Sequence, residues 1–180
     1  MVRPDLSTQW LYDLLANEWS RWLPESTMAT IRKGGYYTTL VRPGLRVIAL
    51  NNQDCYTNNW WLMYDFAFPS VQLQWLHDTL LAAESANEKV HILKHIPSGE
   101  GSCFRVWSRE YRRILDRFWN TISAQFNGHT HKDEFNVFYS LSQPNYAINV
   151  AWNGGSVTPY SNVNYNYRMY YADPQTYVNY

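Results

Sequence analysis

Three histidines stand at points where extended segments give way to loops, and imidazoles in such places can bind a metal ion. His129 and His131 are separated by one residue and follow Gly128, just after the β-like run 121–126. Alternate side chains of an extended segment share a face, so both rings can point the same way. His95 follows the apolar run 90–93 and precedes a loop. Two solvated loop histidines are the simpler interpretation of His129 and His131 alone, but the third histidine favours a metal site.

Other polar residues near these histidines have simpler explanations. Asp133 and Glu134 follow the pair and can orient it as hydrogen-bond acceptors, although solvated charges explain them as well. We expect His91 to be an ordinary strand residue and His77 to be an exposed helix residue. The aromatic run 60–64 is either one wall of a cleft or part of the core.

Overall composition limits the class of protein. The 180 residues favour a single domain with a core of its own. Fifteen basic residues balance fifteen acidic ones, which argues against a general binder of nucleic acid or of anionic membranes. No apolar run approaches the roughly 18 residues of a membrane-spanning helix. The first residues lack the apolar region of a signal peptide, so we expect a cytosolic chain, a mature chain or a piece of a longer protein.

Two cysteines, Cys55 and Cys103, are the only thiols in the sequence. Inside a cell they would be unrelated buried thiols, whereas a secreted protein would more often pair them. Closing that loop would stabilise the fold by about 4 kcal/mol in the chain-entropy model. No Asn-x-Ser/Thr glycosylation site independently supports secretion.

The elements that position the histidines follow from hydrophobic periodicity and turn signals. We predict helices over 7–23, 70–87 and 107–118, and strands over 36–41, 45–50, 89–93, 121–126, 134–139, 146–152 and 165–171. The alternation of strands and helices up to residue 126 predicts a mainly parallel sheet with crossover helices. The strands after His131 are joined by short turns, so this end is expected to be antiparallel.

Helix signals support these boundaries. Ser7 or Thr8 can cap the first helix and Ser70 the second. Apolar side chains at helical spacing predict the buried faces: Leu11, Leu15, Trp19 and Trp22 in the first helix, Leu73, Leu76, Leu80 and Ala83 in the second, and Tyr111, Ile114, Leu115 and Phe118 in the third. The arginines of the third helix are expected to face solvent.

Two motifs resemble those of a known family. His95-Ile-Pro-Ser-Gly and Gly128-His-Thr-His131-Lys-Asp-Glu-Phe resemble the last two signature blocks of the calcineurin-like metallophosphoesterases. The wider sequence resembles the acid sphingomyelinase family from about Trp10 to Tyr180, above all at 72–76, 89–92, 107–108 and 124–126. The resemblance implies an α/β fold that is the C-terminal portion of an αββα sandwich, with a mixed sheet and crossover helices. Residues 1–180 would then be a partial catalytic domain with a β-rich tail, without the upstream metal-binding half or the saposin-like domain.

The family site holds two metal ions, usually zinc. By resemblance, His95 and His129 would bind one ion and His131 the other. The family's bridging carboxylate, its Asn ligand and the histidine that protonates the leaving group belong to upstream blocks with no counterpart here. The resemblance therefore predicts at most one ion in this chain, no retained catalytic residue and impaired hydrolysis by this chain alone.

The resemblance also implies a function and a location. Family members are hydrolases that cleave sphingomyelin to ceramide and phosphocholine at a membrane lipid surface, in lysosomes or outside the cell. Tyr160 matches a tyrosine near the family's substrate pocket, although a packed tyrosine is an equal alternative, and Cys55 and Cys103 match a disulfide. Two alternatives stay open: a non-catalytic relative that binds a lipid head group or a protein partner, and a hydrolase of nucleotide-type phosphodiesters. No feature of the sequence predicts an oligomeric state.

Overall fold

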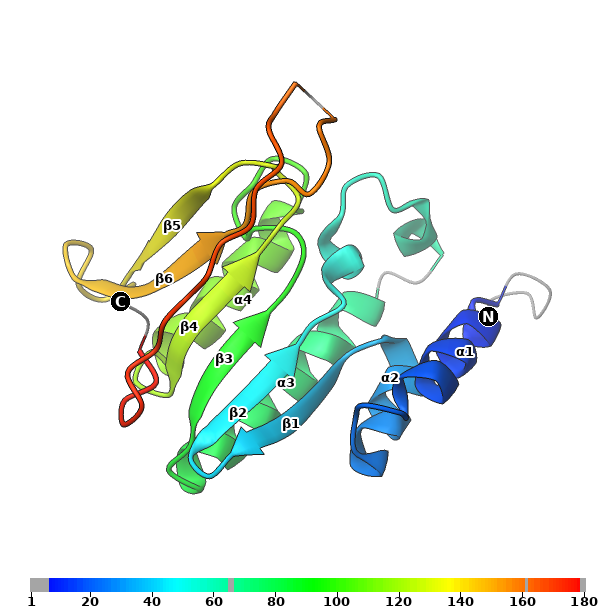
Figure 1. Ribbon diagram of the computed structural model, residues 1–180, viewed down its shortest axis with the longest axis horizontal. Coiled ribbons are helices and arrows are strands. Elements are labelled where there is room, and N and C mark those ends of the chain that lie inside the picture. The colour runs from blue at the N-terminus through cyan, green and yellow to red at the C-terminus, as the bar shows by residue number, and fades with distance from the viewer. Residues whose placement is uncertain (1–6, 65–66, 161, 179–180) are drawn as a thin grey trace.

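One six-stranded mixed sheet organises the protein, as shown by a computed structural model that describes residues 7–64, 67–160 and 162–178 (Figure 1). The strands, in sheet order, are β1 (Tyr37–Arg42), β2 (Leu45–Ala49), β3 (Lys89–Leu93), β4 (Ile122–Asn127), β6 (Ala147–Asn153) and β5 (Glu134–Tyr139). Strands β2, β3, β4 and β6 run parallel, while β1 and β5 are antiparallel to their neighbours at the two edges. The predicted mixed sheet is confirmed.

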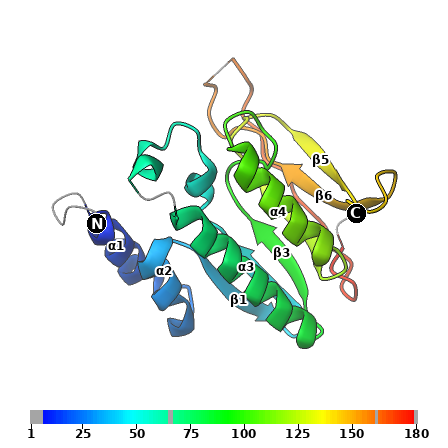
Figure 2. The same cartoon turned by 180° about the vertical axis from the view of Figure 1, so that it is seen from behind.

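Two long helices cover one face of this sheet, as Figure 2 shows from behind. They are α3 (Phe68–Ser85), which connects β2 to β3, and α4 (Arg105–Arg117), which connects β3 to β4. The other helical elements are α1 (Gln9–Trp19), α2 (Met28–Gly34) and the short 3-10 turns η2 (Glu25–Thr27), η3 (Asn52–Cys55) and η4 (Trp60–Met63). Because β2, β3, β4 and β6 run parallel, their carboxyl ends lie together at one end of the sheet.

The core lies between the sheet and the pair α3 and α4. It contains most of the side chains that the periodicity predicted, including Leu76, Leu80, Tyr111, Leu115 and Phe118. One polar contact crosses this core, where the Tyr111 hydroxyl donates to Gln125 Oε1 at 2.6 Å. Burial of these apolar side chains fixes how the helices lie on the strands.

The start of α3 differs from the prediction. Ser70 was expected to cap this helix, but the helix begins at Phe68, and the Ser70 hydroxyl donates to the carbonyl of Ala67 at 2.7 Å. Pro69 lies in the first turn, where a residue without an N–H loses no helical hydrogen bond. The helix can therefore begin before the serine.

The predicted buried face of the first helix is only partly right. Leu15 and Trp19 pack against the residues of α2, as expected. Leu11 and Trp22 instead are 38% and 75% exposed, and Trp22 lies beyond the end of α1. The reason is that α1 packs mainly against α2, a two-turn helix that the sequence pattern did not predict, which is too short to cover a wide apolar stripe.

The C-terminal tail is not a strand, contrary to the prediction for 165–171. It runs over the sheet face opposite α3 and α4, as Figures 1 and 2 both show. Tyr170 packs edge-on against Phe126, with ring centroids 4.9 Å apart, and His91 Nε2 donates to the Tyr177 carbonyl at 2.8 Å. A segment that lies across a sheet face cannot join the hydrogen-bond ladder of an edge.

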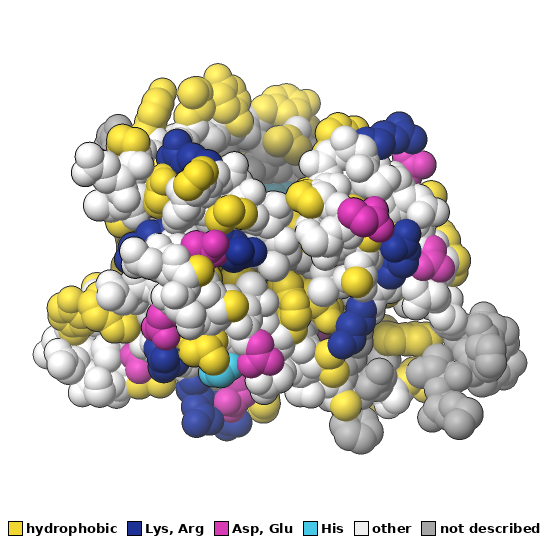
Figure 3. Space-filling view, turned by 90° about the horizontal axis from the view of Figure 1, so that it is seen from below, with side chains coloured by type: hydrophobic (Ala, Val, Ile, Leu, Met, Phe, Trp, Pro, Cys, Tyr) yellow, Lys and Arg dark blue, Asp and Glu magenta, His cyan; other side chains and the backbone are white. Residues whose placement is uncertain are grey.

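Charges of both signs are interspersed over the face drawn in Figure 3. No extended region of one sign appears on that face, which agrees with the balanced charge of the sequence. Within the described ranges, the helices are too short or too polar to cross a bilayer.

Candidate functional site

The site begins where the neighbouring parallel strands β3 and β4 end. His95 lies two residues beyond Leu93, the last residue of β3, and His129 lies two residues beyond Asn127, the last residue of β4. Gly128 N–H donates to the His95 carbonyl at 2.9 Å and so extends the contact between the strands into their loops. The topology of the sheet therefore brings together two histidines that are 34 positions apart.

The two imidazoles face each other through single ring nitrogens. His129 Nδ1 lies 3.3 Å from His95 Nε2, and the ring centroids are 5.1 Å apart. A tetrahedral zinc ion with ligands at 2.0–2.1 Å separates any two of them by about 3.3–3.4 Å. The spacing therefore fits two ligands of one ion. Partial burial lowers the pKa of His95, and the positive charges of His129 and His131 lower it further, so His95 favours the neutral form that binds metals.

His131 lies near this pair but not in contact with it. Its ring packs edge-on against the ring of Tyr160, with centroids 6.3 Å apart. The positive charge of His131 nevertheless contributes to the lowered pKa of His95. Across the residues that the structure describes, no group of three or more His, Cys, Asp or Glu side chains is close enough to hold one ion. The structure thus brings two of the three predicted ligands together and keeps the third close by.

A serine and a glutamate complete the surroundings of His129, and sequence reasoning missed both. Ser102 Oγ lies 2.7 Å from His129 Nε2, and the same hydroxyl donates to the Glu100 carboxylate. The Ser102 hydroxyl also does most to lower the pKa of Glu100. The only signal in the sequence was their position in the loop after His95.

Asp133 does not orient the histidines. Its carboxylate pairs with Arg168 of the C-terminal tail, and Glu134 is the first residue of β5. Of the two interpretations, the structure agrees with the simpler one for Asp133, a surface charge, because its half-exposed carboxylate is directed toward Arg168 and away from the histidines.

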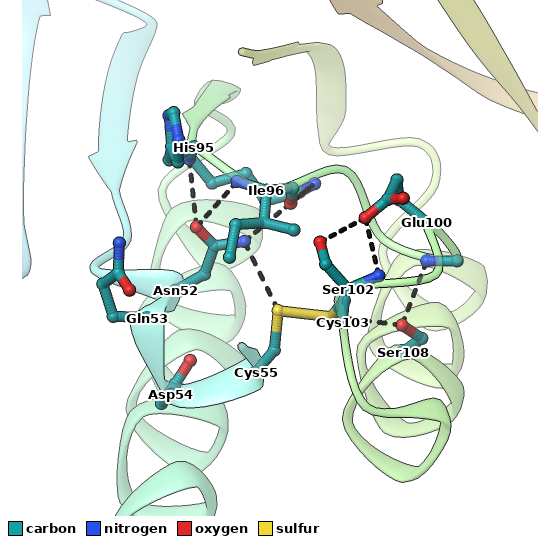
Figure 4. The surroundings of a disulfide bond; sticks show 12 residues. Asn52, Gln53, Asp54, Cys55, His95, Ile96, Glu100, Ser102, Cys103 and Ser108 are labelled. Carbon is teal, nitrogen blue, oxygen red and sulfur yellow. Dashed lines mark hydrogen bonds between the residues drawn. A yellow bond between two sulfur atoms is a disulfide. The ribbon is translucent and has the colours of Figure 1, made fainter. Parts of the chain in front are cut away.

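The disulfide Cys55–Cys103 holds the loop that carries Glu100 and Ser102 (Figure 4). It joins this loop to η3 with a Cα–Cα distance of 4.8 Å, which confirms the pairing that the resemblance implied. Asn52, also in η3, accepts through Oδ1 from the backbone N–H groups of His95 and Ile96 at 3.0 and 3.1 Å. The short turn η3 thus fixes both ends of the loop after β3.

The exposed aromatic run contributes to a separate pocket. Trp60, Leu62 and Met63 line a cavity of about 580 Å³ between η4 and the first turns of α3 and α4. Of the two readings left open for this run, the cleft wall is therefore correct. None of the three candidate histidines lines this cavity. Asp54 does, and burial raises the pKa of its carboxyl to about 7.

At the level of amino-acid sequence, the chain matches a protein family and two known proteins. The family profile described as "Calcineurin-like phosphoesterase" matches residues 3–133. A protein named sphingomyelin phosphodiesterase from Homo sapiens is 46% identical over 170 residues, which are 93% of this chain and 26% of that protein. Its namesake from Bos taurus is 45% identical over 175 residues, or 96% of this chain and 27% of that protein. The chain thus spans about a quarter of the length of these relatives.

A solved structure supports the fold independently. A dimetal phosphatase from Danio rerio superposes with a TM-score of 0.52 over 69% of this chain and 50% of its own. The two sequences are 14% identical. At that identity the likeness shows that the sheet and its helices follow the same plan.

Proposed function

Since the chain belongs to the calcineurin-like phosphoesterase family, we propose that it acts in a metal-dependent phosphodiester hydrolase of the sphingomyelin phosphodiesterase type. The substrate would be sphingomyelin, and the products would be ceramide and phosphocholine. One observation carries the proposal: His95 Nε2 and His129 Nδ1 lie 3.3 Å apart at the ends of parallel strands. That spacing suits two ligands of one ion.

The residues have distinct roles in this proposal. His95 and His129 hold one metal ion, which when bound would polarise a phosphoryl oxygen of the substrate. We propose zinc as the ion, because imidazole is a preferred ligand of zinc. His131 would bind a second ion. Tyr160, whose ring packs against His131, would contact the substrate head group.

The proposed setting is a lysosome or the outside of the cell, at a membrane lipid surface. The disulfide Cys55–Cys103 supports this setting, because disulfides persist in oxidising compartments and are rare in the cytosol. Secretion from cultured cells, or release of the tagged chain from a lysosomal fraction, would test it.

Zinc content and turnover test the proposed function together. His95→Ala and His129→Ala should each lower the zinc bound per chain by at least tenfold, measured by dialysis and elemental analysis. His77→Ala is the control, because it removes an imidazole that lies outside the site, where it packs edge-on against Phe118. Release of phosphocholine from sphingomyelin vesicles, with a nucleotide phosphodiester assayed in parallel, reports activity and substrate class. If the longest natural form of the protein takes up no zinc and hydrolyses neither substrate, the proposal is wrong.

A second function is favoured by one observation. The described part of the chain offers no set of three or more clustered ligands, which suits a non-catalytic relative that binds a lipid head group. That function predicts binding to phosphocholine vesicles which survives both His129→Ala and His131→Ala. Sedimentation with vesicles measures this binding. The hydrolase proposal instead predicts that zinc binding depends on His129, so the zinc content of the same variants distinguishes the two functions.

A further inference from the structure

The loop after β3 makes a chain of contacts that ends on His129. Glu100 Oε2 accepts from the Ser102 backbone N–H at 2.7 Å and also from the Ser102 hydroxyl. The Ser102 oxygen in turn lies 2.7 Å from His129 Nε2, while Glu100 Oε2 itself is 3.8 Å from that nitrogen. The carboxylate therefore reaches the imidazole through the hydroxyl and not directly.

The direction of every hydrogen bond in this chain follows from the carboxylate. An ionised carboxylate only accepts, so the single proton of the Ser102 hydroxyl is committed to Glu100. The Ser102 oxygen can then only accept from His129, so Nε2 of that ring carries the proton. A neutral imidazole with its proton on Nε2 has its lone pair on Nδ1, which is the nitrogen that faces His95 Nε2.

We propose that Ser102 and Glu100 are positioning residues, which hold the His129 ring in the Nε2–H tautomer and aim its Nδ1 lone pair at the metal. This inference rests on the proposed metal site and deepens it. Ligand histidines commonly donate their second N–H to a carboxylate or another acceptor, which fixes the tautomer and strengthens the ligand. Here the Ser102 hydroxyl accepts from the His129 ring and donates to the Glu100 carboxylate, so it links the two groups.

The position of Ser102 is itself fixed by neighbouring bonds. Cys103, the next residue, forms the disulfide to Cys55, and the Ser102 carbonyl accepts from Thr57 N–H at 2.8 Å. Tyr56, between these two partners, packs edge-on against the His129 ring with centroids 5.9 Å apart. The disulfide and the backbone hydrogen bond to Thr57 therefore hold the Ser102 hydroxyl against His129.

Two readouts on the full chain test this inference. Ser102→Ala should weaken zinc binding by about 10–100-fold in competition with a chromophoric chelator. Long-range ¹H–¹⁵N spectra of the apo chain should show His129 as Nε2–H in the wild type and as a mixture of tautomers in Ser102→Ala. Ser102→Thr keeps the hydroxyl and should restore both properties. Ser98→Ala, in the same loop, is the matched control and should match the wild type.

The variant Glu100→Gln tests the role of the carboxylate separately from that of the Ser102 hydroxyl. An amide can donate as well as accept, so the direction of the chain is lost, and this variant should resemble Ser102→Ala. If Ser102→Ala keeps the Nε2–H tautomer and wild-type zinc affinity, the inference is wrong. If no form of the chain binds zinc but the tautomer still responds to Ser102→Ala, the proposed metal site fails while the positioning of His129 stands.

Discussion

Asp54 places a carboxyl group in the wall of the apolar pocket beside η4. The residue is 1% exposed, and its Oδ2 accepts from Gln72 Nε2 at 2.8 Å. Burial disfavours the charged form and raises the pKa from 3.8 to about 7. The hydrogen bonds to this carboxyl do not offset the loss of water around it.

Asp54 should make stability fall as pH rises. The folded state keeps the proton up to about pH 7 whereas the unfolded chain loses it near 3.8. Unfolding therefore releases a proton within this window, and the free energy of unfolding decreases between pH 4 and 7 by up to about 4 kcal/mol. Asp54→Asn should remove this decrease and be more stable than the wild type at pH 7.5, as measured by urea unfolding at several pH values.

Asp78→Asn is the control for this prediction. Asp78 is exposed on α3, and its neighbour His77 lowers its pKa, so its influence on stability has the opposite sign with pH. Equal pH profiles for the wild type and Asp54→Asn would show that the fold does not raise the pKa of Asp54.

At the scale of elements, α4 is bound to β4 by one buried polar contact within an apolar interface. The Tyr111 hydroxyl donates to Gln125 Oε1 at 2.6 Å, and both side chains are fully buried. Gln125 Nε2 in turn donates to Asn149 Oδ1 at 2.7 Å. The contact fixes how far α4 can shift along the strand.

Tyr111→Phe should lower the free energy of unfolding by about 1–3 kcal/mol, because it leaves a buried amide oxygen without its donor. Tyr139→Phe is the control, since that ring is exposed at the edge strand β5. Urea unfolding of the two variants measures the difference. Equal stability of the two variants would mean that water satisfies Gln125 in the folded state.

The disulfide links two elements that the sheet does not join, η3 and the loop before α4. Its cysteines are 48 residues apart, so reduction should lower the free energy of unfolding by about 4 kcal/mol in the chain-entropy model. Urea unfolding with and without a phosphine reductant measures this loss. A Cys55→Ser/Cys103→Ser chain that unfolds at the wild-type midpoint would contradict it.

At the scale of the whole molecule, the two faces of the sheet are covered differently. The helices α3 and α4 cover one face, and the C-terminal tail lies across part of the other (Figure 1). The Tyr170 ring lies between Phe126 and Trp152, with centroids 4.9 and 6.1 Å away. Aromatic contacts of this kind, instead of strand pairing, fix the tail to the sheet.

Tyr170→Ala should release the tail and destabilise the fold by about 1–3 kcal/mol, because a half-buried ring is lost. Tyr170→Phe keeps the ring and should leave stability unchanged or raised, since the buried hydroxyl makes no hydrogen bond within the described structure. Urea unfolding and hydrogen exchange of the amides at 166–178 measure both. Equal exchange in the two variants would show that other contacts hold the tail.

Much of this fold was readable in the sequence because hydrophobic periodicity is a local property. Strands β3 and β5 have the predicted bounds, and β2 and β4 agree within one residue. The histidine motifs likewise identified the loops after β3 and β4, but the expected alternation of His129 and His131 along an extended segment is wrong, because both residues have left-handed backbone angles, with φ of 76° and 62°. The sequence pattern did not predict the exposure of Leu11 and Trp22, because the size of α2 decides how much of α1 is covered and the helix ends before Trp22.

The sequence by itself determined the identity of the candidate ligands and the parallel strands that carry them. Only the tertiary structure decided that His95 and His129 meet nitrogen to nitrogen, that Asp133 turns to Arg168 instead, and that Ser102 and Glu100 support the His129 ring. The physical reason is that periodicity depends on neighbours along the chain. Contacts across loops depend on sheet register and on the disulfide, which brings together residues far apart in sequence.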